Sequence, residues 1–193
     1  LKLRQVCCDL RLLKGDAVAT SRGSSSGKLD SLLDMLDELM SEGRRVLLFS
    51  QFTSMLALIE AELQARKIAY AKLTGSTQDR RTPVQRFQAG EFPVFLISLK
   101  AGGSGLNLTA ADTVIHFDPW WNPAVEAQAI DRTHRIGQTK NVMVYRLVAR
   151  DTIEEKVLAL QRKKAELFTA LMDDGSAFSE ALTADDVRDL LGG

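Results

Sequence analysis

Two arginines and a glutamine at helical spacing are the residues of this sequence best suited to phosphate chemistry. Gln128, Arg132 and Arg135 stand at positions i, i+4 and i+7, so a helix through this segment presents all three on one face. The arginine guanidinium keeps its charge, and its planar fork binds phosphate oxygens in pairs. The spacing therefore indicates a phosphate-binding surface, with a solvated charged face as the alternative that it leaves open.

A glycine-rich segment, Ser98 to Leu108, is the second candidate phosphate site. It follows an apolar run of strand length and combines Lys100 with Gly102, Gly103 and Gly105. Ligands of open α/β sheets bind at the carboxyl ends of the strands, where glycines let backbone amides approach a phosphate. A tight turn accounts for one or two glycines, but three with a flanking lysine favour an anion site.

Other segments resemble complete active sites but lack an essential part. In Gly23 to Leu29, three residues separate the glycines where a phosphate loop needs four, and leucine follows Lys28 in place of Ser or Thr. Gly103 to Leu108 ends in leucine at the third glycine position of a dinucleotide fingerprint. Asp118 is followed by proline rather than by an acidic partner, which favours a satisfied strand-end carboxylate over a magnesium ligand.

Metal and disulfide chemistry find little support in the sequence. His116 and His134 are far apart and have no partner at ligand spacing, so no metal site is expected. Cys7 and Cys8 are adjacent, which fits neither a disulfide framework nor zinc-ligand spacing, so we expect small core residues. No apolar run is long enough to span a bilayer and no secretory signal is seen, so a cytoplasmic, nucleoid-associated protein is expected.

The composition is that of a globular protein with balanced charge. Of the 193 residues, 45% are hydrophobic and 26% are charged, and 25 Lys plus Arg balance 25 Asp plus Glu. This balance argues against a histone-like basic binder but leaves room for a local phosphate-binding face, because the local field decides such binding. The length fits one domain with appended segments. Because the sequence begins at Leu1 rather than Met, we expect it to be part of a longer protein.

Apolar strands that alternate with amphipathic helices are expected to position these candidates. Strands are predicted over residues 45–50, 68–73, 93–98, 113–118 and 141–148. Helices are predicted over about 1–13 and 29–40, after Gln51, over 79–88 and from about Pro123. The strands show no period-2 pattern, which is typical of a parallel sheet buried on both faces. The predicted fold class is α/β, with an open, mostly parallel sheet and helices on both faces.

Several segments together resemble the C-terminal RecA-like lobe of Swi/Snf-type ATPases in helicase superfamily two. They span nearly the whole chain and are Leu3 to Cys8, Ser26 to Leu29, Val46 to Phe52, Ser98 to Leu108, Asp118 to Pro123 and Gln128 to Gln138. Asp118 to Pro123 and Gln128 to Gln138, which resembles motif VI, are the most diagnostic. The resemblance implies a RecA-like sheet followed by a C-terminal brace helix from Thr152, where Thr152 and Glu155 fit a capping box.

The resemblance also implies a division of the chain. Residues 1–27 would form a connecting helix and linker from a first lobe, 28–150 the helicase lobe, 151–175 the brace helix and 176–193 a tail with a short helix. The tail matches no part of the family pattern. The short loops and the ending from Thr152 resemble bacterial members, so a bacterial source is expected.

Roles for single residues are carried over from the resemblance only where the motifs match. Arg135 is the expected arginine finger, and Arg132 its companion on the nucleotide phosphates. Further ATP contacts are expected from Gly105, Asn107 and Gln128. Contacts with the DNA backbone are expected from Ser50, Gln51, Thr74, Thr77, Arg80, Lys100, Ala101 and Gly102. Of Trp120 and Trp121, one is expected to couple the two sites and the other to pack in the core.

The function implied is that of the second motor lobe of an ATP-dependent, double-stranded DNA translocase. The phosphate-loop lysine and the acidic magnesium-binding pair of a first lobe are missing, so ATP with Mg²⁺ is expected to bind between two lobes, and the isolated chain is expected to be inactive. Closure would bring Arg132 and Arg135 onto the phosphates, and hydrolysis would shift the grip on DNA. Tracking of phosphates needs no base-edge contacts.

Two alternatives come from other functional classes. A degenerate lobe would dock DNA or protein without a catalytic role, which the intact spacing of Arg132 and Arg135 disfavours. A free-standing Rossmann enzyme would bind nucleotide tightly by itself. The motor type is shared by nucleosome remodelling, removal of proteins from DNA, polymerase recycling and repair, so it identifies neither the biological substrate nor strand unwinding. Expected partners are duplex DNA and the first lobe, with no membrane.

Overall fold

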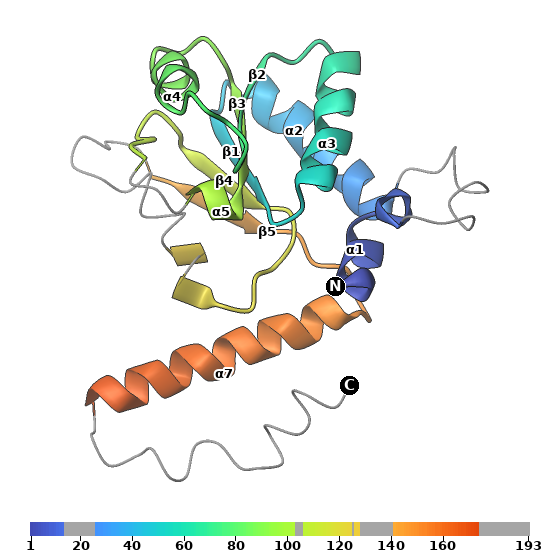
Figure 1. The fold of residues 1–193 in the computed structure, drawn as a ribbon, viewed down its shortest axis with the longest axis vertical. Helices are drawn as coiled ribbons and strands as arrows, with labels where there is room; N and C mark the ends of the chain where they lie inside the picture. Colours follow the sequence, from blue (N-terminus) through green and yellow to red (C-terminus); the bar gives the residue numbers. More distant parts are fainter. Residues whose placement is uncertain (14–25, 103–105, 125, 128–140, 174–193) are drawn as a thin grey trace.

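Five apolar strands form one parallel sheet, as the strand patterns predicted (Figure 1). They are β1 (Val46–Ser50), β2 (Tyr70–Leu73), β3 (Val94–Ser98), β4 (Thr113–His116) and β5 (Met143–Arg146), in the order β2-β3-β1-β4-β5. This computed structural model describes residues 1–13, 26–102, 106–124, 126–127 and 141–173. Every neighbouring pair of strands is parallel, so all five carboxyl ends meet at one edge of the sheet.

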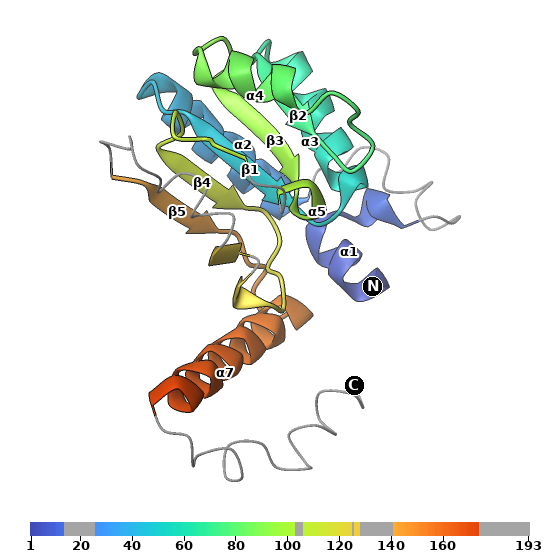
Figure 2. The same cartoon turned by 60° about the vertical axis from the view of Figure 1, so that its left-hand side comes forward.

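Helices cover both faces of the sheet, which confirms the predicted α/β class (Figures 1 and 2). The helices are α1 (Lys2–Cys8), α2 (Gly27–Ser41), α3 (Thr53–Ala65), α4 (Arg81–Gln88), α5 (Leu99–Gly102) and α7 (Ile153–Asp173). Successive strand residues point to opposite faces. Leu48 and Leu96 therefore pack in the core under α1, α2 and α3, whereas Phe49 and Phe95 pack in the core under α4 and α5.

The ends of α2 follow from local sequence. The Ser26 hydroxyl accepts a hydrogen bond from the Leu29 amide at 3.1 Å and donates one to the carbonyl of Cys8 at 2.8 Å, so the N-cap also ties α2 to α1. Gly43 ends the helix with φ +68°, a conformation that favours glycine. The Arg44 amide donates back to the Leu39 carbonyl, as in a Schellman motif.

Two predicted elements differ from the structure in kind, whereas the other described elements differ only at their ends. The helix predicted over residues 1–13 breaks at Asp9, which is extended, and a single 3₁₀ turn at Leu10–Leu12 follows. The Asp9 carboxylate accepts hydrogen bonds from the amide and the guanidinium of Arg11 and thereby caps this new turn instead of continuing the helix. The turn predicted after Ser98 begins as the short helix α5.

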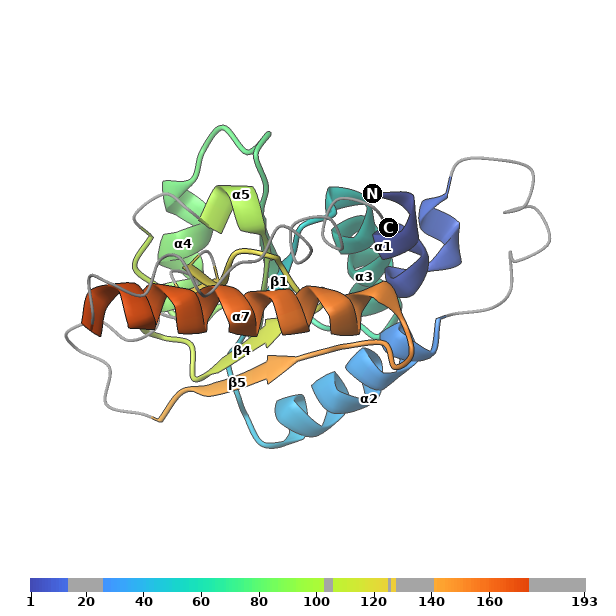
Figure 3. The same cartoon turned by 90° about the horizontal axis from the view of Figure 1, so that it is seen from below.

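The long helix α7 leaves the sheet after β5 and lies beneath it, with one end near α1 (Figure 3). It begins at Ile153, where the brace helix was predicted. The predicted pairing of Thr152 and Glu155 is present in altered form, because the Thr152 hydroxyl accepts from the Glu154 amide at 3.2 Å and Glu155 accepts from the Asp151 amide at 3.1 Å. Of the predicted connecting helix and linker over 1–27, residues 14–25 lie outside the described residues, as does the predicted tail over 176–193, and Gly27 already belongs to α2.

A buried ion pair fixes the start of α7 to the start of α2. The Lys28 ammonium lies 2.7 Å and 2.6 Å from the two carboxylate oxygens of Glu154, and the side chains are 7% and 1% exposed. Glu154 also accepts from the Ala149 amide at 2.8 Å, and the Lys28 ammonium lies over the Phe117 ring. The start of α7 is thus fixed by an ion pair that is shielded from water.

Candidate functional site

A cavity of about 510 Å³ opens at the carboxyl ends of β1, β2 and β3. Its lining comes from residues at or just after these strand ends: Gln51, Thr53, Lys72, Thr74, Gly75, Ser76, Thr77, Ser98 and Lys100. The lining offers two ammonium groups and several hydroxyls, and none of the described residues that form it carries a carboxylate. Such a set of donors suits a phosphate, whose oxygens accept hydrogen bonds and whose charge attracts lysine.

The turn after β2 presents its hydroxyl groups to this cavity. The Thr74 amide donates to the Thr77 hydroxyl at 2.9 Å, and the Thr77 amide donates to the Thr74 carbonyl at 3.1 Å. The hydroxyls of Thr74 and Ser76 lie 2.9 Å apart. This small network is local in sequence and therefore holds the turn in shape before any ligand arrives.

Asp118 orders the chain where β1 ends. One of its carboxylate oxygens accepts from the Ser50 hydroxyl, and the other accepts from the Gln51 amide at 3.1 Å. Burial raises the pKa of Asp118, and these hydrogen bonds only partly oppose that rise. Asp118 is 1% exposed, so it is a satisfied strand-end carboxylate, as the sequence indicated.

The predicted DNA contacts divide into two groups in the structure. Gln51, Thr74, Thr77 and Lys100 line the one cavity. Of the remaining four, Ser50, Arg80 and Ala101 are not among the described residues that line it, and Gly102 is placed only as the last residue of α5.

Burial explains the position of two of these residues, Ser50 and Ala101. Ser50 is fully buried, and its hydroxyl bonds to Asp118 and accepts from the Phe52 amide, so the structure shows a positioning contact for it. Ala101 is also fully buried. Arg80 stands at the N-cap of α4, and Gly102 ends α5. Their contacts with DNA stay predictions.

Lys72 is a cavity residue that the sequence reasoning missed. Its ammonium lies 2.5 Å from a carboxylate oxygen of Glu60 on α3, and the Tyr70 hydroxyl donates to the other oxygen at 2.8 Å. Burial raises the pKa of Glu60, but the hydrogen bonds from Lys72 and Tyr70 outweigh it and hold the pKa below its usual value. The signal in the sequence was a lysine between Ala71 and Leu73, the two buried residues of an apolar strand.

The predicted nucleotide contacts are described only in part. Asn107 is exposed in the segment that precedes β4. Gly105, Gln128, Arg132 and Arg135 lie outside the described residues. Of the helix predicted from Pro123, residues 123–124 and 126–127 are described, and they are helical.

The two tryptophans differ in their surroundings. Trp120 is partly buried: its amide donates to Glu126 at 2.9 Å, and its carbonyl accepts from Gln161 of α7 at 2.8 Å. Trp121 is 47% exposed, with the Lys164 ammonium 4.3 Å from its ring centroid. The loop that carries both is therefore held by α7.

The N-terminal helix holds the same loop from another side. The Arg4 guanidinium donates to the Pro119 carbonyl at 2.6 Å and lies 5.4 Å from the centroid of the Trp120 ring. Since α1 and α7 also contact each other, the two segments and the tryptophan loop form one joined unit.

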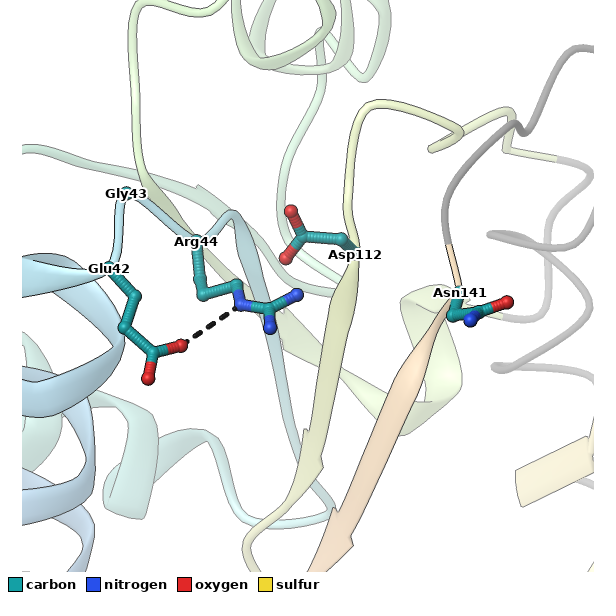
Figure 4. Close-up of a pocket in the computed structure, with 5 residues that line it drawn as sticks. All are labelled: Glu42, Gly43, Arg44, Asp112 and Asn141. Atoms are coloured by element: carbon teal, nitrogen blue, oxygen red, sulfur yellow. Dashed lines mark hydrogen bonds and ion pairs between the residues drawn. The ribbon is translucent and has the colours of Figure 1, made fainter.

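A second cavity of about 510 Å³ lies near the amino ends of β1, β4 and β5 (Figure 4). It is lined by Glu42, Gly43, Arg44, Asp112 and Asn141, and the Arg44 guanidinium pairs with Glu42 at 3.2 Å. Ligands of parallel sheets bind at the opposite, carboxyl edge. The cavity with Lys72 and Lys100 is therefore the better candidate site.

His116 introduces a pH dependence near the site. It is 1% exposed, its ring stacks on Phe49, and within the described part of the chain neither ring nitrogen has a hydrogen-bond partner. Burial lowers its pKa from 6.5 to about 4, against an opposing attraction from Glu126. Between these two values the unfolded chain binds a proton at this residue that the folded chain does not.

We expect the free energy of unfolding to fall as the pH drops from 6.5 towards 4. The stability contributed by neutral His116 is fully present above pH 6.5, and its total loss is on the order of 3 kcal/mol. The His116→Leu variant has no titrating group at this position. Its free energy of unfolding should therefore not show the part of the fall that His116 causes. Urea unfolding of both proteins at pH 7 and pH 5 measures the difference. An equal loss of stability in both would show that His116 is not its source.

The described residues form neither a cluster of metal ligands nor a membrane-spanning helix. No group of three or more His, Cys, Asp or Glu side chains there could hold a metal ion. No helix in those ranges is long and apolar enough to cross a bilayer.

Known proteins that are similar to this chain include helicases and remodeling ATPases. A family model described as helicase conserved C-terminal domain matches residues 27–137. The chromatin-remodeling ATPase INO80 of Mus musculus is 46% identical over 171 residues, which cover 87% of this chain and 11% of that protein. The uncharacterized ATP-dependent helicase MG018 of Mycoplasma genitalium is 41% identical over 193 residues, which cover 98% of this chain and 18% of that protein.

A solved structure is similar as well. The crystal structure of the C-terminal part of the Fun30 ATPase domain superposes with a TM-score of 0.69 at 36% identity, over 83% of this chain and 53% of that one. The chain spans less than a fifth of the two curated relatives described above, at 11% and 18% of their lengths. These relatives are eukaryotic and bacterial, so they do not support the expected bacterial source or nucleoid association.

Proposed function

Because this chain belongs to the helicase conserved C-terminal domain family and is homologous to the C-terminal lobes of Swi/Snf-family ATPases, we propose that it is the second motor lobe of an ATP-dependent, double-stranded DNA translocase. The observation that carries this proposal is the cavity at the carboxyl ends of β1, β2 and β3. Its ammonium and hydroxyl groups match a phosphodiester chain, whereas an enclosed apolar pocket would suit a small metabolite.

In this proposal the lobe holds DNA through its backbone. Lys100, Gln51, Thr74 and Thr77 contact successive phosphate oxygens on one strand. Ser50 acts indirectly, because its bond to Asp118 orders the chain that carries Gln51. Binding through phosphates alone is independent of base sequence, which a translocase requires in order to step along DNA.

The same lobe completes an ATPase site in the proposal. Arg132 and Arg135 reach the nucleotide phosphates when the two lobes close, with Gln128, Gly105 and Asn107 lining the cleft. Bound Mg²⁺ neutralises phosphate charge, and its ligands would come from the first lobe. The described residues support this division, since Asp118, two residues after β4, already accepts hydrogen bonds at both carboxylate oxygens.

The joined unit of α1, α7 and the tryptophan loop supports the proposed division of the chain. Residues 1–27 would connect the two lobes, and residues 151–175 would brace them. Gln161 and Arg4 both hold the loop at Pro119 and Trp120, so a shift of either segment would move this loop. In the proposal the loop lies between the DNA and nucleotide sites. We propose that Trp120 and Trp121 couple the two sites through this loop.

The test is the ATPase activity of this chain and of the full-length protein, each with and without double-stranded DNA. A silent chain beside a DNA-stimulated full-length protein supports half of a two-lobe motor. Full activity of the isolated chain would contradict the two-lobe site. A full-length protein that is silent even with DNA would instead favour a degenerate lobe that docks DNA or protein.

A further inference from the structure

Lys72 lines the candidate cavity but pairs with a carboxylate outside its lining. Its side chain lines the cavity in which the proposed function places a phosphate, yet its ammonium is held by Glu60, which is not a lining residue. The pair is partly exposed, with side-chain exposures of 31% for Lys72 and 25% for Glu60. A pair with this exposure exchanges partners readily, because water compensates each separated charge.

Glu60 is held in place independently of Lys72. The Tyr70 hydroxyl donates to one carboxylate oxygen at 2.8 Å, and the Gln64 amide group donates to that hydroxyl at 2.7 Å. Gln64 stands one helical turn after Glu60 on α3. These hydrogen bonds keep the Glu60 carboxylate in position when the Lys72 ammonium moves away. The same ion pair can therefore form again.

We propose that Glu60 is a built-in competitor of the DNA backbone for Lys72. This inference rests on the proposed function and adds a residue pair to it. With DNA absent, Glu60 holds the ammonium. When a phosphodiester enters the cavity, Lys72 turns to it, and when the phosphate leaves, Glu60 recaptures the lysine. The competition weakens each contact, which lets a translocase release one phosphate and bind the next.

The exchange has a consequence for salt dependence. A lysine that neutralises a phosphate releases a bound counterion, and each such contact steepens the plot of log affinity against log salt by about 0.9. In the native protein Glu60 loses its lysine at the same step and attracts a cation from solution. Counterion release from the DNA and cation uptake by Glu60 nearly cancel. Lys72 therefore contributes little to the salt slope of DNA binding while Glu60 is present.

The test compares full-length proteins binding a labelled duplex between about 50 and 200 mM salt. Glu60→Gln keeps an acceptor for Tyr70 but removes the competing charge. We expect binding about threefold to fivefold tighter at low salt and a slope steeper by about 0.9. Glu62→Gln is the matched control, because it removes one charge from the same helix without a hydrogen bond to Lys72.

A double-mutant cycle separates the exchange from a general charge effect. In a Lys72→Gln background, Glu60→Gln should change affinity and slope no more than Glu62→Gln does, because only the general effect of one removed charge is left. If the gain persists in that background, or if Glu60→Gln behaves as Glu62→Gln does, the competition is overturned. Lys100→Ala tests the proposed site itself: a lowered affinity and a shallower slope support the site even when Glu60→Gln is silent. Binding unaffected by Lys100→Ala and Lys72→Gln would overturn the proposed DNA site.

Discussion

Replacing Arg135 with alanine in the full-length protein is expected to lower DNA-stimulated ATP hydrolysis by about 10³–10⁵-fold. An arginine finger stabilises the charge that develops on the transferred phosphoryl group, so its loss acts on the transition state more than on bound ATP. The rate at saturating ATP should therefore fall far more than the affinity for ATP. Single-turnover hydrolysis with bound duplex DNA, together with nucleotide titration, measures both quantities.

Arg150→Ala is the matched control, because Arg150 is an exposed arginine just after β5. It should leave the rate unchanged. Arg132→Ala should give an intermediate loss, since its proposed role includes binding ground-state phosphates. An Arg135→Ala protein that retains DNA-stimulated ATPase would show that the spacing of Gln128, Arg132 and Arg135 marks only a solvated face.

Replacing Glu154 with alanine is expected to lower the free energy of unfolding by about 3–5 kcal/mol. The change leaves the Lys28 ammonium, 7% exposed, without its partner, and it also removes the acceptor of the Ala149 amide. An unpaired buried charge costs far more than a lost surface pair. Urea unfolding of the chain, followed by its helical signal, measures the change.

Two further variants test the origin of this loss. Glu155→Ala removes an exposed carboxylate at the next position and should cost much less. The double variant Lys28→Met with Glu154→Leu removes both charges and should recover most of the stability, because no buried charge is left without a partner. A double variant as unstable as Glu154→Ala would show that the unpaired charge is not the cause, and that the lost acceptor of the Ala149 amide or packing around Phe117 explains the loss.

The candidate site could be found in the sequence where residues follow strand ends. Lys100 was indicated by the glycine-rich segment that follows a strand, whereas Gln51, Thr74 and Thr77 were expected from the family resemblance. All four lie shortly after the ends of parallel strands, which the sheet brings to one edge. Ser50 stands in the same kind of position, but its side chain points into the interior and bonds to Asp118. That pairing joins residues 68 positions apart, and no local pattern indicates it.

Lys72 is a second residue whose role could not be predicted from local sequence. Within β2 it looks like an ordinary lysine on a strand, because its partner Glu60 is on α3 and its cavity neighbours belong to other loops. Helix α3 and strand β2 are brought together only by packing on one face of the sheet. The Lys28–Glu154 pair, whose residues are 126 positions apart, likewise could not be predicted from the sequence.

Periodicity and motif spacing alone determined the α/β class, the parallel sheet, the positions of most elements and the family resemblance, because these depend on residues that are near in sequence. The tertiary structure decided which strand-end residues face a common cavity and which are buried. It also decided which charges meet: Lys72 with Glu60, and Lys28 with Glu154. The physical reason is that burial and ion pairing depend on distance in space, which the chain sets only when its helices pack on the sheet.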